Sequence, residues 1–464
     1  MPTPLRCLAL CLFLVAQTAG SIAEAGPSPF PLIGKIAPRS ARDIASSSWS
    51  IGCEVLDRDF ASYAAYKHYL GPLGAKGVRL QAGWAKTEKQ PGVYSWQWLD
   101  EIIDDTRAQG TQPWVQFSYG NPAYPEGGGI QMGDAPPTGT ALAAWDRWVT
   151  ATVRRYRDRV QAWEIWNEPD IWTKISLPQY VDLFIRTATI VRAEQPQARI
   201  YALSLAHKAG YAREFLTAVS AAGKLDLVDA ITFHGYPHNP DDLAIYEDLR
   251  MIVAEFPRKI ELRQGETGAP SGPTTGALRD REWTESKQTK WNLCRMLAFH
   301  GRGVPVNLFT LSEFYYPHGR NAKGLLRINP DLSVVGPKPA YFAAQNVFAI
   351  FDDSLQPAPA CTVTSTSEKP LAAYVYRHTG SRRHSVTLWF NGEAPDESPR
   401  FQPVDFVVRG AVFDQPVYVD LQTGNVSALP AANWSQHDGV AEFRGIPLHD
   451  SPILIANRAD LPIR

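Results

Sequence analysis

The sequence predicts an α/β fold, a (β/α)8 TIM barrel followed by a C-terminal β-sandwich domain. Two observations carry this prediction. Between residues 49 and 357, short apolar strands alternate with amphipathic helical stretches, and eight strand-helix units over roughly 300 residues match such a barrel in count and length. Over residues 358–464 the helical periodicity disappears, and short β-rich segments are separated by Gly, Pro, Asn and Ser, which is typical of a β-sandwich.

The barrel elements alternate in chain order. We expect its strands at Trp49–Leu56, Val78–Gly83, Pro113–Tyr119, Val160–Trp166, Arg199–Leu205, Ala230–Tyr236, Lys259–Gly265 and Pro305–Ser312. The helical patterns that alternate with them include Trp96–Gln109, Ala141–Tyr156, Gln179–Glu194, Tyr211–Ala222, Asp241–Phe256, Glu282–His300 and Pro339–Phe348. A doubly wound open sheet is the alternative, and it is disfavoured because no Gly-x-Gly-x-x-Gly turn follows the first strand.

The remaining segments belong to the second domain and to the N-terminus. Strands of the β-sandwich are expected at Leu371–Tyr376, His384–Phe390, Val404–Val408, Pro416–Asp420 and Ile453–Ala456. Residues 26–48 precede the first barrel strand, and we expect this N-terminal segment to pair with the small domain.

Residues 1–25 have the three-part layout of a secretory signal peptide. Arg6 is followed by the apolar run Cys7–Ala16 and by small residues that end at Ala25. The run is too short to span a bilayer, so we expect cleavage and a secreted or periplasmic protein, the alternative being a buried N-terminal helix. No later segment has eighteen uninterrupted apolar residues, so no membrane partner is expected.

The composition narrows the classes of partner. Lys and Arg number 46 against 47 Asp and Glu, without a basic stripe, which excludes nucleic acid as an expected partner. The 14 Trp and 18 Tyr offer flat faces that can stack on sugar rings or on one another. Beyond the signal peptide, Cys53, Cys294 and Cys361 allow at most one disulfide, whose pairing the sequence leaves open, as it does the oligomeric state.

The stretch Val160–Asp170, V-Q-A-W-E-I-W-N-E-P-D, places two glutamates along the fourth barrel strand. Strand alternation puts Glu164, Trp166 and Glu168 on the inward side. Because an ionised group is costly to bury unpaired, Glu164 is expected to be a structural carboxylate that pairs with a barrel arginine. Glu168 lies at the carboxyl end of the strand, where barrel enzymes place their chemistry, and is the catalytic candidate.

A second carboxylate ends the seventh strand. The stretch Arg263–Ser271, R-Q-G-E-T-G-A-P-S, carries Glu266 in the corresponding position. Strands four and seven lie on opposite sides of a barrel mouth, so Glu168 and Glu266 can face each other across one pocket. This arrangement suits glycoside hydrolysis with retention, in which the two carboxyl groups stand about 5 Å apart, whereas an inverting pair stands further apart.

The string Trp166-Asn167-Glu168-Pro169, with a glutamate closing strand seven, resembles glycoside hydrolase clan A. The longer string W-E-I-W-N-E-P-D is most similar to family 39, which includes β-xylosidases and α-L-iduronidases. The resemblance covers residues 49–350. It extends to the tail, where G-L-L-R-I-N-P-D-L, P-K-P-A-Y, D-L-Q-T-G and H-D-S-P-I-L-I look like the end of such barrels and their β-sandwich appendage.

The resemblance implies that Glu168 is the general acid/base, that Glu266 is the nucleophile and that Asn167 holds the sugar 2-hydroxyl. The alternative for Asn167 is a strand-ending residue that bonds its own backbone.

Other inward positions supply candidates for substrate binding. His234 and Tyr236 follow Thr232 on the inward face of strand six, where clan members commonly have a His or Tyr near the nucleophile, and a tyrosine hydroxyl bonded to Glu266 would keep it ionised. Arg79 points inward from strand two, where it can lower the pKa of the nucleophile, pair with Glu164, or do both. Glu54, Trp84, Tyr119 and Asn121 end strands one to three and are candidates to line the sugar pocket, as is His207 after strand five.

The sequence departs from the clan in two places. Many members end strand eight with a tryptophan under the sugar, whereas this chain reads L-F-T-L-S-E-F-Y-Y, so Glu313, Phe314 or Tyr315 is expected in that place. The nucleophile context G-E-T-G-A-P-S is unlike the typical family 39 string and is similar to endo-acting β-glucanases of the clan. The substrate therefore stays open between β-xylosidase-like and β-glucanase-like glycans.

Two rival functions share this barrel. A non-catalytic carbohydrate-binding protein on a degenerate glycosidase barrel is compatible with the fold. In a site without catalytic activity, however, nothing would offset the energetic cost of burying two carboxylates. A metal-dependent hydrolase needs a His/Asp ligand set, and no H-x-H ends strand one and no other ligand spacing occurs. The sequence thus predicts a secreted retaining glycoside hydrolase with a carbohydrate substrate and neither a metal nor an organic cofactor.

Overall fold

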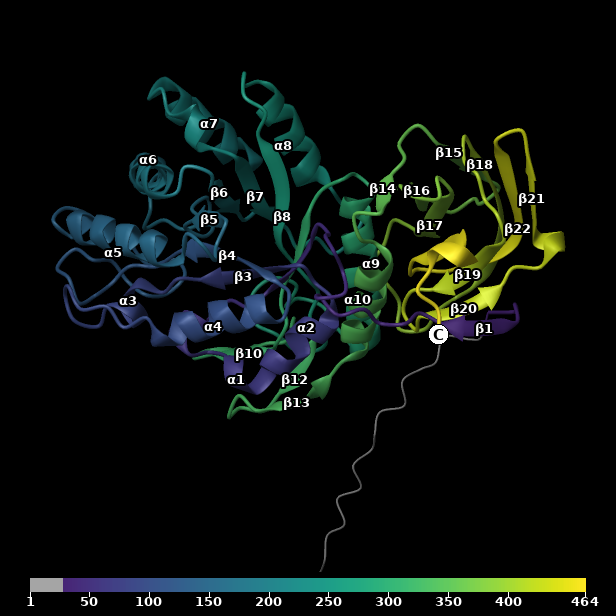
Figure 1. The fold of residues 1–464 in the computed structure, drawn as a ribbon, viewed down its shortest axis with the longest axis horizontal. Helices are drawn as coiled ribbons and strands as arrows, with labels where there is room; N and C mark the ends of the chain where they lie inside the picture. The colour runs from purple at the N-terminus through teal and green to yellow at the C-terminus, as the bar shows by residue number, and fades with distance from the viewer. Residues whose placement is uncertain (1–27) are drawn as a thin grey trace, which may run out of the picture.

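The computed structural model describes residues 28–464, and it confirms the predicted α/β architecture (Figure 1). The predicted signal peptide lies outside the described residues. Parallel strands β2 to β9 close into an eight-stranded barrel in the order of the sequence. These strands span Trp49–Gly52 (β2), Gly77–Gln81 (β3), Gln112–Phe117 (β4), Ala162–Ile165 (β5), Arg199–Leu205 (β6), Ala230–His234 (β7), Glu261–Thr267 (β8) and Val306–Leu308 (β9).

All the predicted barrel helices are present. They span Gln97–Ala108 (α4), Ala141–Tyr156 (α5), Leu177–Glu194 (α6), Ala209–Ala221 (α7), Ala244–Ala254 (α8), Glu285–His300 (α9) and Pro339–Ile350 (α10). Their starts follow local capping chemistry, as α6 illustrates: the Ser176 hydroxyl accepts the backbone N–H of Gln179, whose side chain accepts the backbone N–H of Ser176. This reciprocal pair satisfies donors that the first helical turn leaves free.

The structure adds elements that the sequence pattern did not predict. The short helices α1 (Tyr63–Tyr66), α2 (Leu70–Leu73) and α3 (Trp84–Thr87) follow the first two barrel strands, and two hairpins follow β9. The hairpins are formed by β10 (Phe314–Tyr316) with β11 (Gly319–Asn321), and by β12 (Leu326–Ile328) with β13 (Val334–Pro337). The eighth barrel strand is therefore shorter than expected and gives way to a loop and hairpins.

The C-terminal domain is a β-sandwich, as predicted. One antiparallel sheet has the order β1-β20-β19-β23-β17-β16-β14, and the other has the order β15-β18-β22-β21. The strands span Leu32–Lys35 (β1), Leu355–Pro357 (β14), Thr362–Ser365 (β15), Leu371–His378 (β16), His384–Phe390 (β17), Gln402–Arg409 (β18), Pro416–Asp420 (β19), Asn425–Ala428 (β20), Trp434–His437 (β21), Val440–Leu448 (β22) and Ile453–Asn457 (β23). Apolar side chains such as Val386, Leu388, Phe406 and Phe443 form a core of their own between the sheets.

Two strands join this sandwich from outside its predicted limits. Strand β1 pairs antiparallel with β20, so the N-terminal segment does pair with the small domain. Strand β14 pairs with β16 and ends at residue 357, so the sheet begins just before the expected boundary at residue 358.

Helices α9 and α10 lie between the barrel and the sandwich (Figure 1). Nearly every side chain of α9 is buried, because the barrel covers one side and the sandwich the other. The Lys290 ammonium on α9 pairs with the Asp450 carboxylate at 2.8 Å, and the Trp389 indole donates to Asp241 at 3.0 Å. The two domains are thus joined by a buried polar interface.

Within the described residues, the chain has neither a candidate membrane-spanning helix nor a disulfide. Among residues 28–464, no helix is both long enough and apolar enough to cross a membrane. Cys53 and Cys294 are buried, Cys361 is partly exposed, and none of these three forms a disulfide within the described residues.

The interdomain ion pair yields a prediction for stability. Lys290→Met leaves the Asp450 carboxylate without its cation, and Lys290 itself is only 1% exposed. Removing one partner of a buried pair is strongly destabilising, so the free energy of unfolding should fall by about 3 kcal/mol. Arg400→Met is the matched control, because its contact with Asp396 spans 3.9 Å and lies in solvent; an exposed pair of this kind contributes about 1 kcal/mol at most. Calorimetric melting that gives equal shifts for the two variants would contradict the assignment.

Candidate active site

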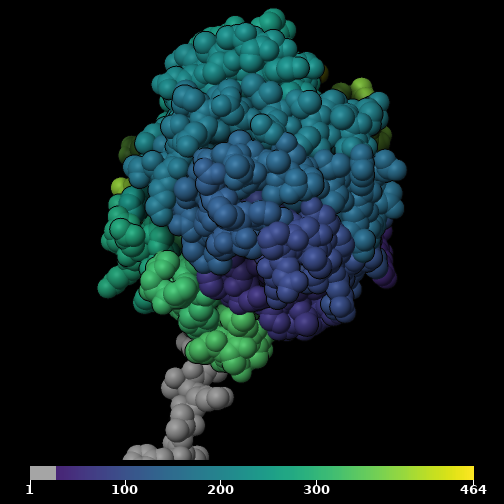
Figure 2. All heavy atoms as spheres, turned by 90° about the vertical axis from the view of Figure 1, so that its left-hand side faces the viewer, coloured from purple at the N-terminus to yellow at the C-terminus, as the bar shows by residue number. Residues whose placement is uncertain are grey.

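A cavity of about 610 Å³ opens at the carboxyl ends of the barrel strands. All eight strand ends contribute to its lining, which is the geometry expected of a barrel enzyme. The lining residues at or after β2 to β9 are, in order, Glu54, Gln81, Tyr119, Asn167 with Glu168, Ala206, Gly235 with Tyr236, Glu266, and Phe309. Viewed from the side opposite the β-sandwich, the surface is formed by barrel segments, from purple through blue to teal, with green segments at the lower edge (Figure 2).

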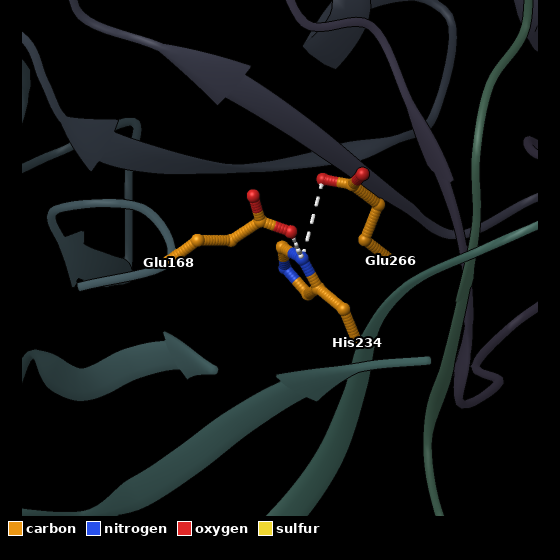
Figure 3. A group of neighbouring side chains, drawn as sticks. All are labelled: Glu168, His234 and Glu266. Atoms are coloured by element: carbon orange, nitrogen blue, oxygen red, sulfur yellow. Dashed lines mark hydrogen bonds and ion pairs between the residues drawn. The ribbon is translucent and has the colours of Figure 1, made fainter. Parts of the chain in front are cut away.

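The side chains of Glu168 and Glu266 point toward each other from opposite sides, with His234 between them (Figure 3). One carboxylate oxygen of each glutamate and a ring nitrogen of His234 all lie within 4.8 Å of one another. The exposed fractions of the Glu168 and Glu266 side chains are 12% and 14%. The structure thus brings the two predicted carboxylates together in one small and largely desolvated space.

The loop after β5 aims Glu168 at the cavity. The backbone N–H of Glu168 donates to the carbonyl of Ser204 on β6 at 3.0 Å. Two residues later, the Asp170 carboxylate accepts the backbone N–H groups of Ala206, His207 and Lys208 at 2.9 to 3.0 Å. These bonds tie the end of β5 to the end of β6 and hold the glutamate in place.

At Trp166, just after β5, the structure departs from the strand alternation that the sequence predicts. Its φ is +65°, a left-handed conformation that is uncommon outside glycine. Strand alternation stops there, and the indole is buried against Tyr119 and against Trp145 of α5, outside the cavity lining. Glu168 is also left-handed, with a φ of +52°, and it reaches the cavity because the chain has already turned.

Arg79, on β3, lies beneath the cavity floor and is fully buried. Its guanidinium pairs with Glu164 at 2.7 Å, Glu266 at 3.0 Å and Glu54 at 3.1 Å. It also donates to the Asn167 amide oxygen at 3.0 Å and to the Ser204 hydroxyl at 2.7 Å. A guanidinium has five N–H donors, and hydrogen bonds occupy all of them. Both expected roles of Arg79, as partner of Glu164 and as neighbour of Glu266, are therefore found together.

The Glu164 carboxylate is completely buried. Besides Arg79, it accepts the Gln116 amide at 2.8 Å and the Thr232 hydroxyl. These partners satisfy the charge that burial would otherwise make costly. The expectation that Glu164 pairs with a barrel arginine is confirmed.

His234, at the end of β7, is buried behind the two catalytic candidates rather than in the cavity wall. Its Nδ1 lies 2.9 Å from Glu168 Oε1 and 3.7 Å from Glu266 Oε2, and its Nε2 lies 2.8 Å from the Ser204 hydroxyl. Burial by itself lowers the pKa of His234, but the neighbouring charges of Glu266 and Glu168 outweigh burial and raise it.

The two glutamates have opposite pKa shifts. Burial raises the pKa of Glu168, and the nearby Glu266 carboxylate adds to this effect, against the opposing hydrogen bond and charge of His234. Burial also acts to raise the pKa of Glu266, but His234 and Arg79 lower it, and hydrogen bonds from Tyr236 and Arg79 help to bring it below its usual value. The Tyr236 hydroxyl donates to Glu266 Oε1 at 2.6 Å. Glu266 is thus held ionised, whereas Glu168 is biased toward its protonated form.

A third carboxyl group, that of Glu54, lines the cavity. Burial raises the pKa of Glu54 to about 7, against the opposing charge of Arg79. Its Oε1 accepts from Arg79, and its Oε2 lies 3.4 Å from the Thr310 hydroxyl. Among Glu54, Glu168 and Glu266, Glu54 thus carries the shift that brings its pKa nearest neutral pH.

Among the residues predicted to bind substrate, Asn167, Tyr236, Glu54 and Tyr119 line the cavity together with His207. Five others do not. Arg79 and His234 lie behind the lining and contact the two glutamates, and Trp84, Asn121 and Glu313 lie elsewhere, contrary to the prediction. Trp84 begins α3, packs against Trp148 and donates its indole N–H to Glu88 at 2.6 Å.

Asn121 and Glu313 are the other two corrections. The Asn121 amide donates to the Glu88 carbonyl at 2.7 Å and so holds the loop after β4 together. The Glu313 carboxylate is buried against the Lys338 ammonium at 2.7 Å. Both side chains support loops behind the cavity, because each lies beyond the end of its strand, where alternation no longer fixes direction.

The end of the eighth strand also differs from expectation. Phe309 and Tyr316 line the cavity, whereas Glu313, Phe314 and Tyr315 do not. Strand β9 ends at residue 308, so Phe309 is the first residue beyond it. Phe314 packs against the rings of Phe309 and Tyr316 and supports them from behind. The string L-F-T-L-S-E-F-Y-Y offered the right aromatic residues, but an overlong strand assignment selected the wrong ones.

Sequence reasoning missed several lining residues that come from outside the barrel strands. They include Arg58, Met132, Trp172, Arg295, Asn321 and Lys323. Arg58 follows the first strand closely enough for the loop position to have suggested it. The others come from long loops, a helix or the hairpin region, and no local pattern marks them.

Within the described residues, Glu168, His234 and Glu266 form one group whose spacing could hold a metal ion. Their facing atoms are already engaged, because His234 Nδ1 bonds Glu168, and Glu266 accepts from Tyr236 and Arg79. A guanidinium that donates into the same group competes with any cation. The arrangement favours proton transfer over metal binding.

The fold can now be compared with known proteins. No protein-family model and no curated protein sequence matches the chain. A family 39 glycoside hydrolase from Bacteroides cellulosilyticus WH2 aligns with a TM-score of 0.66 at 18% identity, over 89% of this chain and 81% of that one. A family 39 β-xylosidase from Caulobacter crescentus aligns with a TM-score of 0.58 at 19% identity, over 92% and 98% of the two chains.

A third solved structure, a family 30 endoxylanase from Clostridium papyrosolvens C71, aligns with a TM-score of 0.54 at 14% identity, over 92% and 98% of the two chains. The chain has the fold of these glycoside hydrolases. The resemblance predicted from the motifs on the fourth and seventh strands is therefore confirmed at the level of the fold.

Arg79 yields the prediction for this site. Arg79→Met leaves the carboxylates of Glu54, Glu164 and Glu266 without their shared cation, so the free energy of unfolding should fall by about 3 to 5 kcal/mol. Arg154→Met is the control, because its partner Glu194 is held on the surface and such pairs contribute about 1 kcal/mol at most. Urea unfolding compares the two; a loss for Arg79→Met no larger than the control would argue against the shared role.

Proposed function

We propose that the protein is a retaining glycoside hydrolase that cleaves O-glycosidic bonds in oligosaccharides or polysaccharides. One observation carries the proposal: Glu168 and Glu266 face each other in one cavity, with oxygens within 4.8 Å and with pKa values shifted in opposite directions. Carboxyl groups about 5 Å apart suit direct attack on the sugar, whereas an inverting pair leaves room for a water molecule between them.

In the first step, a Glu266 oxygen attacks the anomeric carbon while Glu168 donates its proton to the leaving glycosidic oxygen. The bond to the leaving group breaks, and a glycosyl ester forms on Glu266. In the second step, Glu168 takes a proton from water, the water oxygen bonds to the anomeric carbon, and the ester bond breaks. Both glutamates then return to their starting protonation states.

Electrostatic coupling between the glutamates supports this exchange of roles. The Glu266 charge is among the causes that raise the pKa of Glu168. Once Glu266 is esterified, that charge is lost, so the pKa of Glu168 falls. Glu168 is then a base when the second step needs one, and an acid again after Glu266 is released.

The neighbouring groups have defined parts in this scheme. Asn167 is positioned by Arg79 and lines the cavity beside Glu168, where it can hold a sugar hydroxyl. Tyr236 and Arg79 donate to Glu266 and keep it ionised. His234 bonds Glu168 and orients the proton donor.

For the substrate, we propose a glycan of the β-xylosidase-like or β-glucanase-like class. The solved structures that share the fold include a β-xylosidase and an endoxylanase. The signal-like pattern of residues 1–25 supports export, so we propose action in the periplasm or outside the cell.

The nucleophile and the acid/base are tested by paired variants. Glu266→Gln should lower the turnover of aryl glycosides by a factor of about 10³ or more. Glu168→Ala should be slow in water and partly rescued by azide, because azide attacks the glycosyl ester without a general base. The glycosyl azide should keep the anomeric configuration of the substrate.

Glu214→Gln, an exposed glutamate on α7, is the control and should leave turnover unchanged. Full activity of Glu266→Gln, or an azide product of inverted configuration, would reject the mechanism.

The pKa shifts predict a bell-shaped dependence of kcat/KM on pH. Activity needs ionised Glu266, whose pKa is lowered, so the rate rises with pH below the ordinary carboxyl range. Activity also needs protonated Glu168, whose pKa is raised, so the rate falls above that range.

Tyr236→Phe removes a hydrogen bond that stabilises ionised Glu266, so the acid limb should move to higher pH. Tyr374→Phe, on β16 and outside the cavity lining, is the matched control and should leave both limbs in place. If the acid limb of Tyr236→Phe lies at the same pH as in the wild type or at a lower pH, the proposed role of the Tyr236 hydrogen bond is wrong.

A further inference from the structure

The hairpin region after β9 forms one wall of the cavity. Tyr316 ends β10, Asn321 ends β11, and Lys323 follows two residues later; all three line the cavity. This wall comes from outside the barrel strands, on elements other than those that carry the two glutamates. It brings a phenol, an amide and an ammonium group to the space where a sugar would bind.

Lys323 differs from the other buried lysines of the described chain. Lys290, Lys323 and Lys338 are 1%, 2% and 0% exposed. Lys290 pairs with Asp450 at 2.8 Å, and Lys338 pairs with Glu313 at 2.7 Å. Within residues 28–464, no carboxylate lies within 4.0 Å of the Lys323 ammonium. Buried charges in proteins are usually paired. The Lys323 ammonium is therefore a buried cation to which a bound anion would supply the usual partner.

The Lys323 ammonium is held in place but only partly satisfied. It donates to the Ala277 carbonyl at 2.8 Å and lies 5.2 Å from the centre of the Tyr236 ring. An ammonium has three donors, and within the described residues a hydrogen bond occupies one of them. Because Lys323 lines the cavity, its other donors can serve a ligand there. Burial lowers the pKa of Lys323 to about 8, with the Glu266 charge acting against it, and the group is therefore mostly charged near neutral pH.

The position of Lys323 relates it to the reacting sugar. Tyr236, whose ring the ammonium contacts, donates its hydroxyl to the Glu266 carboxylate at 2.6 Å. The cation therefore lies one aromatic ring away from the nucleophile. A sugar packed against Tyr236 would present its substituents to Lys323 and to the Asn321 amide.

Arg295, from α9, is a second cation in the lining that has no carboxylate partner within 4.0 Å in the described chain. Its Nη1 donates to the carbonyls of Pro240 and Asp242, whereas the buried Nε and Nη2 have no partner within the described residues. A Cβ on Gly235 would lie 3.1 Å from Nη2, so the glycine at the end of β7 leaves the guanidinium close to the cavity. Positive charge without a carboxylate partner within 4.0 Å in the described chain thus occurs at two places in the cavity lining, one in the hairpin region and one on α9.

We infer that the cavity takes an acidic sugar, and that the Lys323 ammonium binds its negative group, the carboxylate of a uronic acid or a sulfate ester. This inference rests on the proposed function for the identity of the reaction, but the binding site itself does not depend on turnover. Charge-assisted hydrogen bonds are stronger than neutral ones. Lys323 is accordingly a specificity-determining residue.

The test is a binding comparison on the full chain by isothermal titration calorimetry. The probes are glucuronate, glucose 6-sulfate and glucose, with the corresponding galactose series. At least one acidic sugar should bind about tenfold or more tightly than its neutral counterpart. The carboxylate and sulfate arms decide which anion the site accepts.

Three variants assign the effect to Lys323. Lys323→Met should remove the preference for the acidic sugar, and Lys323→Arg should keep most of it because the charge remains. Lys224→Met, an exposed lysine beyond α7, should keep the preference in full. If no acidic sugar binds, if acidic and neutral sugars bind alike, or if Lys323→Met keeps the preference, the inference is overturned.

Hydrolysis of acidic polysaccharides before and after chemical reduction of their carboxyl groups separates this inference from the proposed function. A ratio of kcat/KM that favours the acidic form in the wild type and falls in Lys323→Met supports both. Glu266-dependent hydrolysis without any acidic preference overturns the inference alone. Binding of acidic sugars that needs Lys323, with no glycan hydrolysed, overturns the proposed function alone.

Discussion

The site depends on one shared cation, the guanidinium of Arg79. It lies under the barrel mouth with every donor occupied, and it joins the carboxylates of Glu54, Glu164 and Glu266 to the amide of Asn167. Without it, the barrel would bury like charges with no compensation, which burial makes very costly. The bonds from Arg79 compensate the buried negative charges, and one of them also orients the Glu266 carboxylate. The stability of the barrel and the position of the nucleophile candidate therefore depend on the same residue.

Around this cation, two chemically identical side chains acquire different roles. Glu266 accepts from Tyr236 and Arg79 and is held ionised, whereas the Glu168 carboxylate, among the described residues, hydrogen-bonds to His234 alone and is biased toward protonation. Pairs of acids whose environments push their pKa values apart are characteristic of acid/base chemistry. The asymmetry arises from the strands that carry the partners, because Arg79 on β3 and Tyr236 after β7 both reach the tip of β8.

The sequence predicts the regular part of this molecule well and the irregular part poorly. Strand alternation correctly puts Glu164 and Arg79 in the barrel interior, and the strings around Glu168 and Glu266 mark the two carboxylates. It fails at Trp166, where a left-handed residue ends the alternation, and at Glu313, whose partner Lys338 lies 25 residues away in the chain. No local sequence pattern marks Lys323, because what distinguishes it is that no carboxylate lies beside it in the described part of the fold. Periodicity describes repeating backbone, whereas loops are set by tertiary contacts.

The central claim is that the network around Arg79 holds Glu266 ionised and Glu168 protonated over a common pH range. Carbon-detected NMR titration of the glutamate carboxyl groups, assigned with the Glu168→Gln and Glu266→Gln variants, measures this directly. The account predicts a pKa for Glu266 below the ordinary glutamate value and a pKa for Glu168 above it. The reverse order, or two ordinary values, would contradict it.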